Sequence, residues 1–196
     1  MGSIMVIENL TLDGVMQAPG RADEDTRDGF AHGGWATPYS DEVAVRVMGE
    51  GMAAGNVALL FGRRTYEDFA GFWPKQTGNP FTPVLDARRK YVVSTTLVDP
   101  LPWRNSVLLP GDAAKSVAEL RQETDDDLVV FGSGELCRTL LGHDLVDRFM
   151  LLIHPVVLGA GRRLFTDGAV PGRLRLVESV PTSTGVLITT YVPADR

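Results

Sequence analysis

Apolar and polar positions alternate with two different periods along the first two thirds of the chain. Short apolar runs of strand length are separated by segments in which apolar side chains recur at helical spacing. The strand-like runs are residues 4–10, 56–62, 90–96, 106–111 and 125–134. The helix-like segments are residues 41–55, 63–72, 112–124 and 135–142. This alternation predicts a mainly parallel sheet with helices on both faces.

The pattern changes after residue 142, where the apolar runs no longer alternate with helical segments. Residues 146–159 and 173–193 are rich in β-branched and other apolar residues, and Ser183, Thr184 and Gly185 interrupt the second run. Such a pattern is typical of strands joined by a tight turn. We therefore predict a single α/β domain over residues 1–196: a mixed, mainly parallel sheet flanked by helices, with a C-terminal antiparallel hairpin.

Residues 13–40 form the longest segment without strand or helix periodicity, and they are rich in Gly, Pro and Asp. A loop of this length in a compact domain is usually functional or disordered. Ser40 or Asp41 can cap the helix that follows, and Gly55 can end it. Residues 73–89 are irregular, with a short helix near their end.

Composition narrows the possible functions. The net charge of -6 argues against a nucleic-acid or anionic-membrane surface. Sixteen of the 19 basic residues are arginines, which suit forked contacts to phosphate. The single cysteine, Cys137, excludes an internal disulfide, and with only three histidines we expect no metal site. No signal peptide or run of about 20 apolar residues is evident, so we expect a cytoplasmic protein.

Three of the predicted strand ends carry residues that suit a phosphate. Ligands of parallel α/β sheets bind beyond the carboxyl ends of the strands. The three groups are Gly62, Arg63, Arg64 and Thr65; Ser94, Thr95 and Thr96; and Gly132, Ser133 and Gly134. Glycine turns at helix starts, arginines and hydroxyls all favour an anion. Each group alone is equally well explained as a strain-relieving turn, surface charge or plain strand end. Together they favour an anion, although the chain lacks the complete GxGxxG spacing.

The order of these motifs resembles the dihydrofolate-reductase-like superfamily, especially the reductase domain of bacterial riboflavin biosynthesis and its stand-alone relatives. The resemblance spans most of the chain. The stretches that carry it are "LTLDG" (10–14), "FGRRTYEDF" (61–69), "YVVSTTL" (91–97), "LVVFGSGELCRTLL" (128–141) and "LVDRFMLLIHPVVLGAGRRLF" (145–165).

The resemblance implies NADPH as the cofactor and gives the three strand ends roles. Residues 62–65 would lie at the pyrophosphate and 2′-phosphate, with Arg63 or Arg64 as the charged partner. Ser94 and Thr95 would border the 2′-phosphate. The backbone of Gly132, Ser133, Gly134 and Glu135 would contact the pyrophosphate, with Leu136 packed nearby. The segment that begins at Leu12 would border the nicotinamide.

The substrate side is less defined. In folate reductases an acid early in the first helix holds the pterin, but the corresponding count here reaches Val45 and Arg46. Water, Asp13, Asp41 and Glu42 are the candidate proton donors, and the sequence does not choose among them. Asp13 has a second interpretation as a turn residue. Trp35 and Tyr39 are candidates for stacking on a flat substrate, or for packing the loop. His154 is better explained as a core or edge residue.

These observations predict an NADPH-dependent reductase of a small planar heterocycle, such as a pteridine or the ribosylaminopyrimidine of riboflavin synthesis. The alternative is a nucleotide-binding module of the same fold without turnover, and a third is a purely structural domain. The partner would be a small molecule. A homodimer is also expected, with residues 186–192 of the closing hairpin as the pairing edge.

Overall fold

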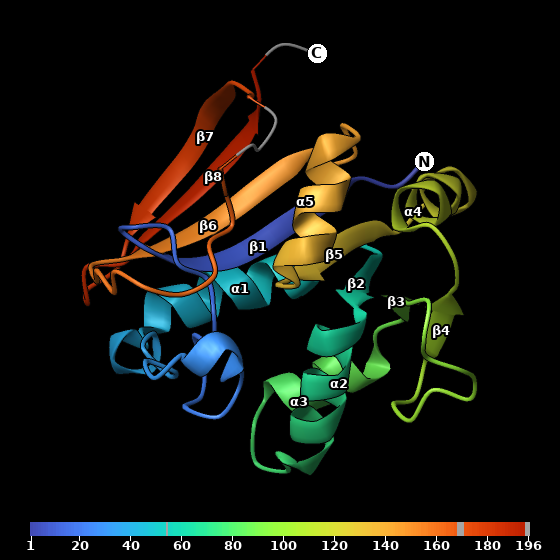
Figure 1. Ribbon diagram of the computed structural model, residues 1–196, viewed down its shortest axis with the longest axis horizontal. Helices are drawn as coiled ribbons and strands as arrows, with labels where there is room; N and C mark the ends of the chain where they lie inside the picture. Colours follow the sequence, from blue (N-terminus) through green and yellow to red (C-terminus); the bar gives the residue numbers. More distant parts are fainter. Residues whose placement is uncertain (54, 168–170, 195–196) are drawn as a thin grey trace.

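An eight-stranded sheet crosses the molecule in the order β4-β3-β2-β5-β1-β6-β8-β7 (Figure 1). The computed structural model describes residues 1–53, 55–167 and 171–194. The strands are β1 (Ile4–Thr11), β2 (Val57–Gly62), β3 (Lys90–Val93), β4 (Ser106–Leu109), β5 (Asp127–Phe131), β6 (Arg148–His154), β7 (Leu174–Pro181) and β8 (Leu187–Pro193). The helices are α1 (Glu42–Ala53), α2 (Arg63–Phe72), α3 (Phe81–Ala87), α4 (Ala113–Glu123) and α5 (Gly134–Gly142).

The strand directions confirm the predicted fold class. All neighbours from β4 through β6 pair in parallel, whereas β8 pairs antiparallel with both β6 and β7. The hairpin turns at Gly185, which adopts a positive φ of 86°. One detail of the prediction was wrong: residues 186–192 are not the free edge, because β8 lies between β6 and β7. Strand β8 pairs with β6 on one side and with β7 on the other, so β7 is the edge strand.

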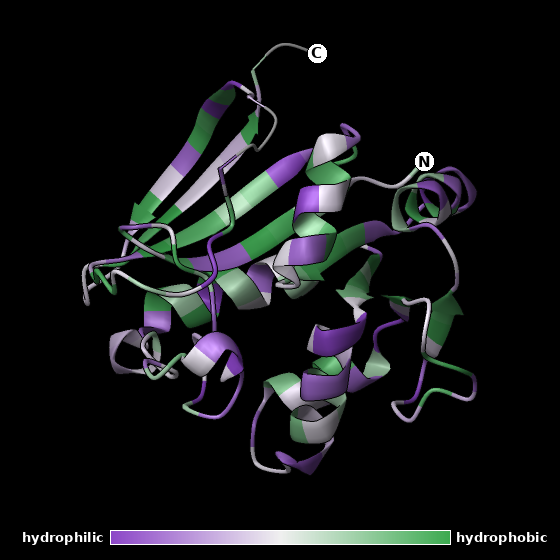
Figure 2. Ribbon diagram, viewed as in Figure 1, coloured by the Kyte–Doolittle hydropathy of each residue, from purple (hydrophilic) through white to green (hydrophobic). Residues whose placement is uncertain are grey.

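The sheet separates two hydrophobic cores. Side chains alternate across β1, so that Val6 and Leu10 pack on the side of α4 and α5, while Ile7 packs on the side of α1, α2 and α3. The central strands are accordingly the most hydrophobic part of the ribbon (Figure 2). Because both faces of the central strands are covered, the ends of these strands are the parts that remain open to a ligand.

The long loop after β1 is ordered around a small core of its own. Val15, Ala18, Phe30 and Trp35 are buried against one another, and the indole Nε1 of Trp35 donates to the carbonyl oxygen of Gln17 at 2.7 Å. Two short 3-10 turns, Arg27–Gly29 and Thr37–Tyr39, complete the segment. The loop is therefore a folded segment, and the expectation of a disordered loop does not hold.

Three sequence-based boundaries are refined. Asp41 rather than Ser40 caps α1, since its Oδ1 accepts from the amide of Val43 at 2.6 Å. Helix α1 ends at Ala53, with Gly55 in a positive-φ conformation beyond it, and Ala54 lies outside the described residues. The short helix expected between residues 73 and 89 is α3. Among the described helices, none combines the length and apolarity that crossing a bilayer requires.

Candidate functional site

The three groups of residues that we predicted to bind phosphate lie at one edge of the sheet. Strands β3, β2 and β5 are immediate neighbours and parallel, so their carboxyl ends lie side by side. Gly62 is in register with Val93, which places Ser94 beside Arg63. Leu60 is in register with Val130, which brings Gly62 level with Gly132. Residues 70 positions apart in the sequence thus share one edge of the sheet.

The turns that lead into α2 and α5 are in direct contact. A Cβ on Gly62 would lie 2.1 Å from Ser133 Oγ and 3.1 Å from Ser133 Cβ, so only glycine allows this approach. Gly132 needs its glycine for another reason, because its φ is 67°. Ser133 also adopts a positive φ, of 73°, which is strained for a residue with a side chain. The Ser133 side chain is therefore packed directly against Gly62.

Side-chain caps close the starts of α1 and α4 but not those of α2, α3 and α5. Neither α2 nor α5 has a side-chain cap hydrogen bond. By contrast, Asp41 caps α1 and Asp112 caps α4 through the amide of Lys115, while Asn79 accepts from the first amide of α3. First-turn amides cannot be satisfied within their own helix. The starts of α2 and α5 therefore offer N–H groups and positive dipole ends to an anion.

The arginines and hydroxyls at the edge are placed unequally. Arg63 forms an ion pair with Glu67 one turn along α2, with 2.9 Å between Nη1 of Arg63 and Oε2 of Glu67. Arg64 is exposed. The buried hydroxyl of Ser94 accepts from the amides of Thr96 and Leu97, so it closes a local turn. Thr95 is exposed beside it. Arg64 and Thr95 are thus the better placed candidates for a ligand contact.

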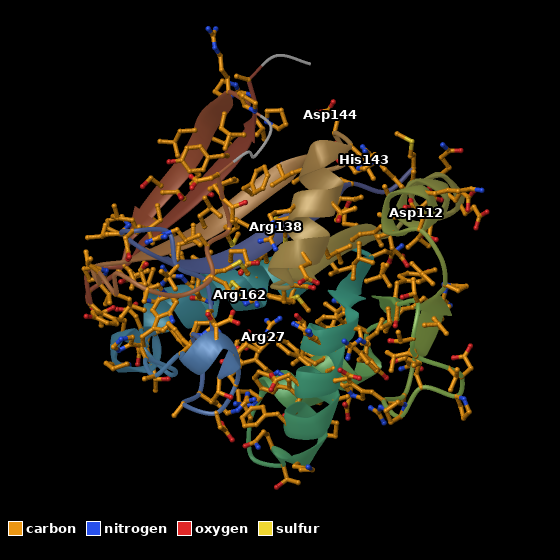
Figure 3. The ribbon with its side chains drawn as sticks, in the orientation of Figure 1. Arg27, Asp112, Arg138, His143, Asp144 and Arg162 are labelled. Carbon is orange, nitrogen blue, oxygen red and sulfur yellow. The ribbon has the colours of Figure 1, made fainter. Side chains whose placement is uncertain are left out.

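Arg138 is a basic residue at this edge that the sequence interpretation missed. Its NH1 donates to the carbonyl oxygen of Arg163 at 3.3 Å and lies 3.2 Å from where a Cβ of Gly134 would be. Figure 3 shows its side chain close to the start of α5, in the same region as those of Arg27 and Arg162. The signal was present in the sequence, since Arg138 follows Gly134 by one helical turn.

Asp13 holds two loops together. Its carboxylate accepts from the amides of Leu158 and Gly159 at 3.1 and 2.9 Å and from the hydroxyl of Thr11 at 2.6 Å. These hydrogen bonds, that of Thr11 foremost, lower the pKa of Asp13 to about 2. The carboxylate is therefore ionised and engaged near neutral pH, which favours the turn-residue interpretation over that of proton donor.

Asp41 and Glu42 differ in their surroundings. Besides capping α1, Asp41 accepts from the amide of Ser183 at 2.9 Å and from its hydroxyl, which lowers the pKa of Asp41. It thereby fastens the start of α1 to the β7–β8 turn. Glu42 is exposed in the first turn of α1. Their catalytic roles stay predictions.

The aromatic candidates surround a buried histidine. His154, at the end of β6, lies edge-on to the rings of Trp35 and Tyr39, with centroid distances of 5.2 and 5.7 Å. Its Nε2 lies 2.9 Å from Asn9 Oδ1, and burial lowers the pKa of His154 to about 4. The imidazole is thus neutral near neutral pH. Trp35 is buried in the loop core, while Tyr39 is partly exposed, so Tyr39 is better placed to meet a substrate.

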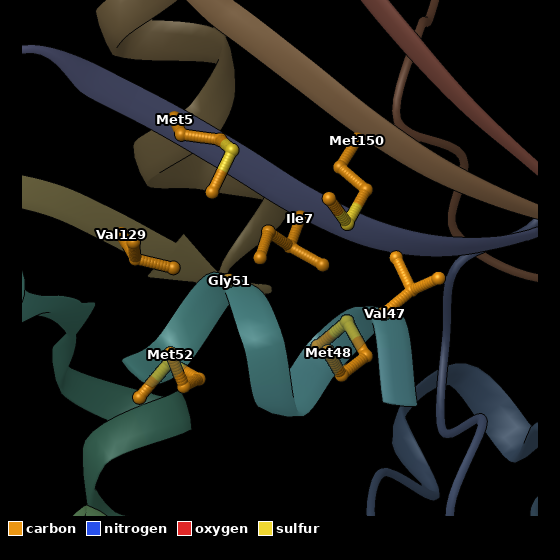
Figure 4. A pocket seen from close by; sticks show the side chains of 8 residues that line it. All are labelled: Met5, Ile7, Val47, Met48, Gly51, Met52, Val129 and Met150. Atoms are coloured by element: carbon orange, nitrogen blue, oxygen red, sulfur yellow. The ribbon is translucent and has the colours of Figure 1, made fainter. Parts of the chain in front are cut away.

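Two cavities are present among the described residues. One, of about 10 Å³, lies between α1 and the sheet and has room for a single water at most (Figure 4). Its lining is apolar: Met5, Ile7, Val47, Met48, Gly51, Met52, Val129 and Met150. The other, of about 280 Å³, has a mixed lining and lies between residues 27–32 and 160–162, where Phe30 joins the polar residues Gln17, Arg27 and Arg162. Only the second approaches the size of a small-molecule pocket.

Comparison with known proteins extends these observations. A family model described as the RibD C-terminal domain matches residues 3–188. The uncharacterised Bacillus subtilis (strain 168) protein YyaP is 29% identical over 139 residues, which cover 68% of this chain and 72% of YyaP. A putative riboflavin biosynthesis protein from Shewanella sp. PV-4 superposes with a TM-score of 0.68 at 19% identity, over 98% of this chain and 99% of that one. A dihydrofolate reductase from Enterococcus faecalis, solved with NADP(H) and RAB-propyl, gives a TM-score of 0.63 at 14% identity, over 99% and 98% of the two chains.

Proposed function

The chain belongs to the RibD C-terminal domain family, and on that premise we propose that it is an NADPH-dependent reductase of a small, planar heterocycle. One observation carries the proposal: the uncapped starts of α2 and α5 touch through Gly62 and Ser133. Two helix starts in direct contact suit the two linked phosphates of one dinucleotide better than two separate anions.

In this proposal, different residues of the edge bind different parts of the cofactor. The first-turn amides of α5, reached past Gly132 and Gly134, hold the pyrophosphate, and Arg138 adds a positive charge beside them. Gly62 and Thr65 line the opposite side. Arg64 and Thr95, both exposed where β2 and β3 end, hold the 2′-phosphate, with Arg63 in support.

The bound cofactor supplies a hydride from its nicotinamide, and the chain's own residues supply orientation and a dry site. The phosphate contacts fix the cofactor along the edge of β3, β2 and β5. The folded loop of residues 15–38, pinned by Gln17 to the backbone of Arg162 at 3.0 Å, covers the neighbouring side. We assign the substrate to the space beside this loop, where the cavity of about 280 Å³ approaches the size of a small-molecule pocket. A pteridine or a ribosylaminopyrimidine is the substrate class that the family suggests.

The proposal is tested by titrating NADPH into the protein while following the fluorescence of Trp35, Trp73 and Trp103, and then by following NADPH oxidation with a panel of pteridines and aminopyrimidines. Saturable binding together with oxidation of at least one compound is the expected result. Absence of saturable binding, checked by calorimetry, would contradict it.

A nucleotide-binding module without turnover is the second candidate. It is favoured by the state of the aspartates that sequence analysis offered as proton donors. Asp13 and Asp41 are engaged in hydrogen bonds that lower the pKa of each, so neither is suited to give a proton near neutral pH. Tight NADPH binding without oxidation of any compound in the panel is the outcome that selects this candidate.

A homodimer through β7 is a further part of the proposal. This edge strand exposes Leu174, Leu176 and Val177 along its length, and its outer side pairs with no strand of the described chain. Exposed apolar edge strands are templates for pairing. Light scattering should give twice the chain mass, and Val177→Lys should return it to the monomer value. A monomeric wild type would contradict this part alone.

A further inference from the structure

Strand β1 carries a buried ionisable side chain that has no part in the mechanism so far. Glu8 is 4% exposed. Its Oε1 lies 3.7 Å from the Sγ of Cys137, and the same Sγ lies 3.8 Å from the carbonyl oxygen of Gly132. Because Ile7 is in register with Phe131, Glu8 is level with the turn that begins at Gly132. The carboxyl group therefore lies beneath the proposed phosphate turn.

The surroundings of Glu8 favour its neutral form. Burial raises its pKa to about 8, the thiol of Cys137 partly offsets this, and the charge of Glu24 on the long loop adds to it. Cys137 is itself neutral, since burial raises the pKa of its thiol well above 9. Arg138 on α5 is the cation that acts on this thiol. Near neutral pH, Glu8 is thus a carboxylic acid with a hydrogen to donate.

The free oxygen of Glu8 has no acceptor within the described part of the chain. Oε1 is taken by the thiol, and no hydrogen bond of Oε2 is present among the described residues. Among the described residues, the fully buried side-chain polar atoms without a hydrogen-bond partner are His154 Nδ1 and Arg162 Nε. Oε2 of Glu8 is not one of them, so it is not fully enclosed. It therefore reaches the small exposed part of the side chain. The described contacts place this carboxyl next to Cys137, which in turn contacts the carbonyl oxygen of Gly132. A buried acid without an acceptor for its hydrogen calls for one from outside the described residues.

We propose that Glu8 is a positioning residue of the cofactor site, which donates its Oε2 hydrogen from beneath the Gly132–Gly134 turn to an oxygen of the cofactor's pyrophosphate or adjoining ribose. This inference rests on the proposed function. A neutral acid makes a short, strong hydrogen bond to a phosphate oxygen, whereas the ionised carboxylate repels it. Cofactor binding is therefore coupled to the proton on Glu8, and it weakens once that proton is lost.

The test compares NADPH and NADH binding to the wild type and to Glu8→Gln by calorimetry between about pH 7 and pH 9.5. Glutamine keeps a donor of similar shape but does not titrate. The wild-type Kd for both cofactors should rise by up to about tenfold per pH unit above pH 8, because one proton is linked to binding. The Glu8→Gln Kd should stay level. Glu119→Gln, on the exposed face of α4, should keep the wild-type slope.

The outcomes separate this inference from the proposed function. A wild-type affinity that stays level to pH 9.5, or a Glu8→Gln slope equal to that of the wild type, overturns the inference and leaves the cofactor site standing. No NADPH binding at pH 7 overturns the proposed function and this inference with it.

A second variant keeps the test decisive if Glu8→Gln fails to fold, which a thermal melt reveals. Cys137→Ala removes the hydrogen bond that lowers the pKa of Glu8, so the onset of the pH slope should move to higher pH. An unchanged onset in a folded Cys137→Ala protein contradicts the inference.

Discussion

Four helix starts of this molecule form two pairs, and the difference between the pairs indicates where we expect a ligand. Helices α1 and α4 begin with aspartates that accept from their first-turn amides at 2.6 and 2.9 Å. Helices α2 and α5 begin at Gly62 and Ser133, without a side-chain cap. A cap is worth about 1 kcal/mol to a protein. In the proposed function, a bound anion takes the place of the cap at two adjacent helices, at the carboxyl edge of a parallel sheet.

The largest effect on the proposed difference between capped and uncapped helix starts is expected from removing the positive charge beside the start of α2. Arg63→Ala combined with Arg64→Ala should raise the Kd for NADPH tenfold or more, because a hydrogen bond to a charged group contributes about 1.5–3 kcal/mol. The Kd for NADH, which lacks the 2′-phosphate, should change little. Calorimetry with both cofactors is the measurement. Lys115→Ala on capped α4 is the control, and equal weakening of both cofactors refutes the 2′-phosphate assignment.

The charge beside the α5 start should act differently. Arg138→Ala should weaken NADPH and NADH alike, by about tenfold, since the pyrophosphate is common to both and one charged hydrogen bond is lost. The same titrations measure it. If only NADPH weakened, Arg138 would belong to the 2′-phosphate site and the division of roles between α2 and α5 would be wrong.

On the capped side, the expected effect is on stability alone. Asp112→Ala removes the hydrogen bond to the amide of Lys115 and should cost about 1 kcal/mol of unfolding free energy, or roughly 2–4 °C in Tm. NADPH affinity should remain at the wild-type value. A melting curve and one titration suffice. A change in affinity without a change in Tm would mean that capped and uncapped starts do not differ in function.

The smallest expected effect is the pH response of the α1 cap. The hydroxyl and amide of Ser183 hold the pKa of Asp41 below its ordinary value of 3.8. A folded-state pKa below the unfolded one stabilises the fold above about pH 3.8, and this stabilisation is lost as the pH falls below it. Melting temperatures of the wild type should therefore drop more steeply in acid than those of Asp41→Asn. Parallel acid slopes would count against the cap.

Much of the fold was accessible from apolar periodicity because its elements are local. The run before Gly62 and the helix from Arg63 to Phe72 were predicted with the bounds that α2 has, since a glycine turn separates two unlike periods. The hairpin was also predictable, but not which of its strands lies at the edge. That depends on which strand pairs with β6, a contact between distant parts of the chain.

The candidate site was predictable to a similar extent and for similar reasons. Glycines, arginines and hydroxyls at strand ends can be recognised one motif at a time, and parallel sheet topology brings them together. The state of Asp13 could not be predicted, because its partners Leu158 and Gly159 are about 145 residues away. Glu8 was hidden for the same reason: its burial depends on Cys137, 129 residues further along the chain.

The central claim is that the first-turn amides of α2 and α5 bind the phosphates of one cofactor, and backbone amide NMR tests it most directly. As NADPH is added to labelled protein, the amide signals of Arg64, Thr65, Glu135 and Leu136 should shift together along one saturation curve. Those of Ala114 and Lys115, at the capped start of α4, should stay in place. Shifts at only one of the two helix starts, or saturation with both starts unmoved, would contradict the account.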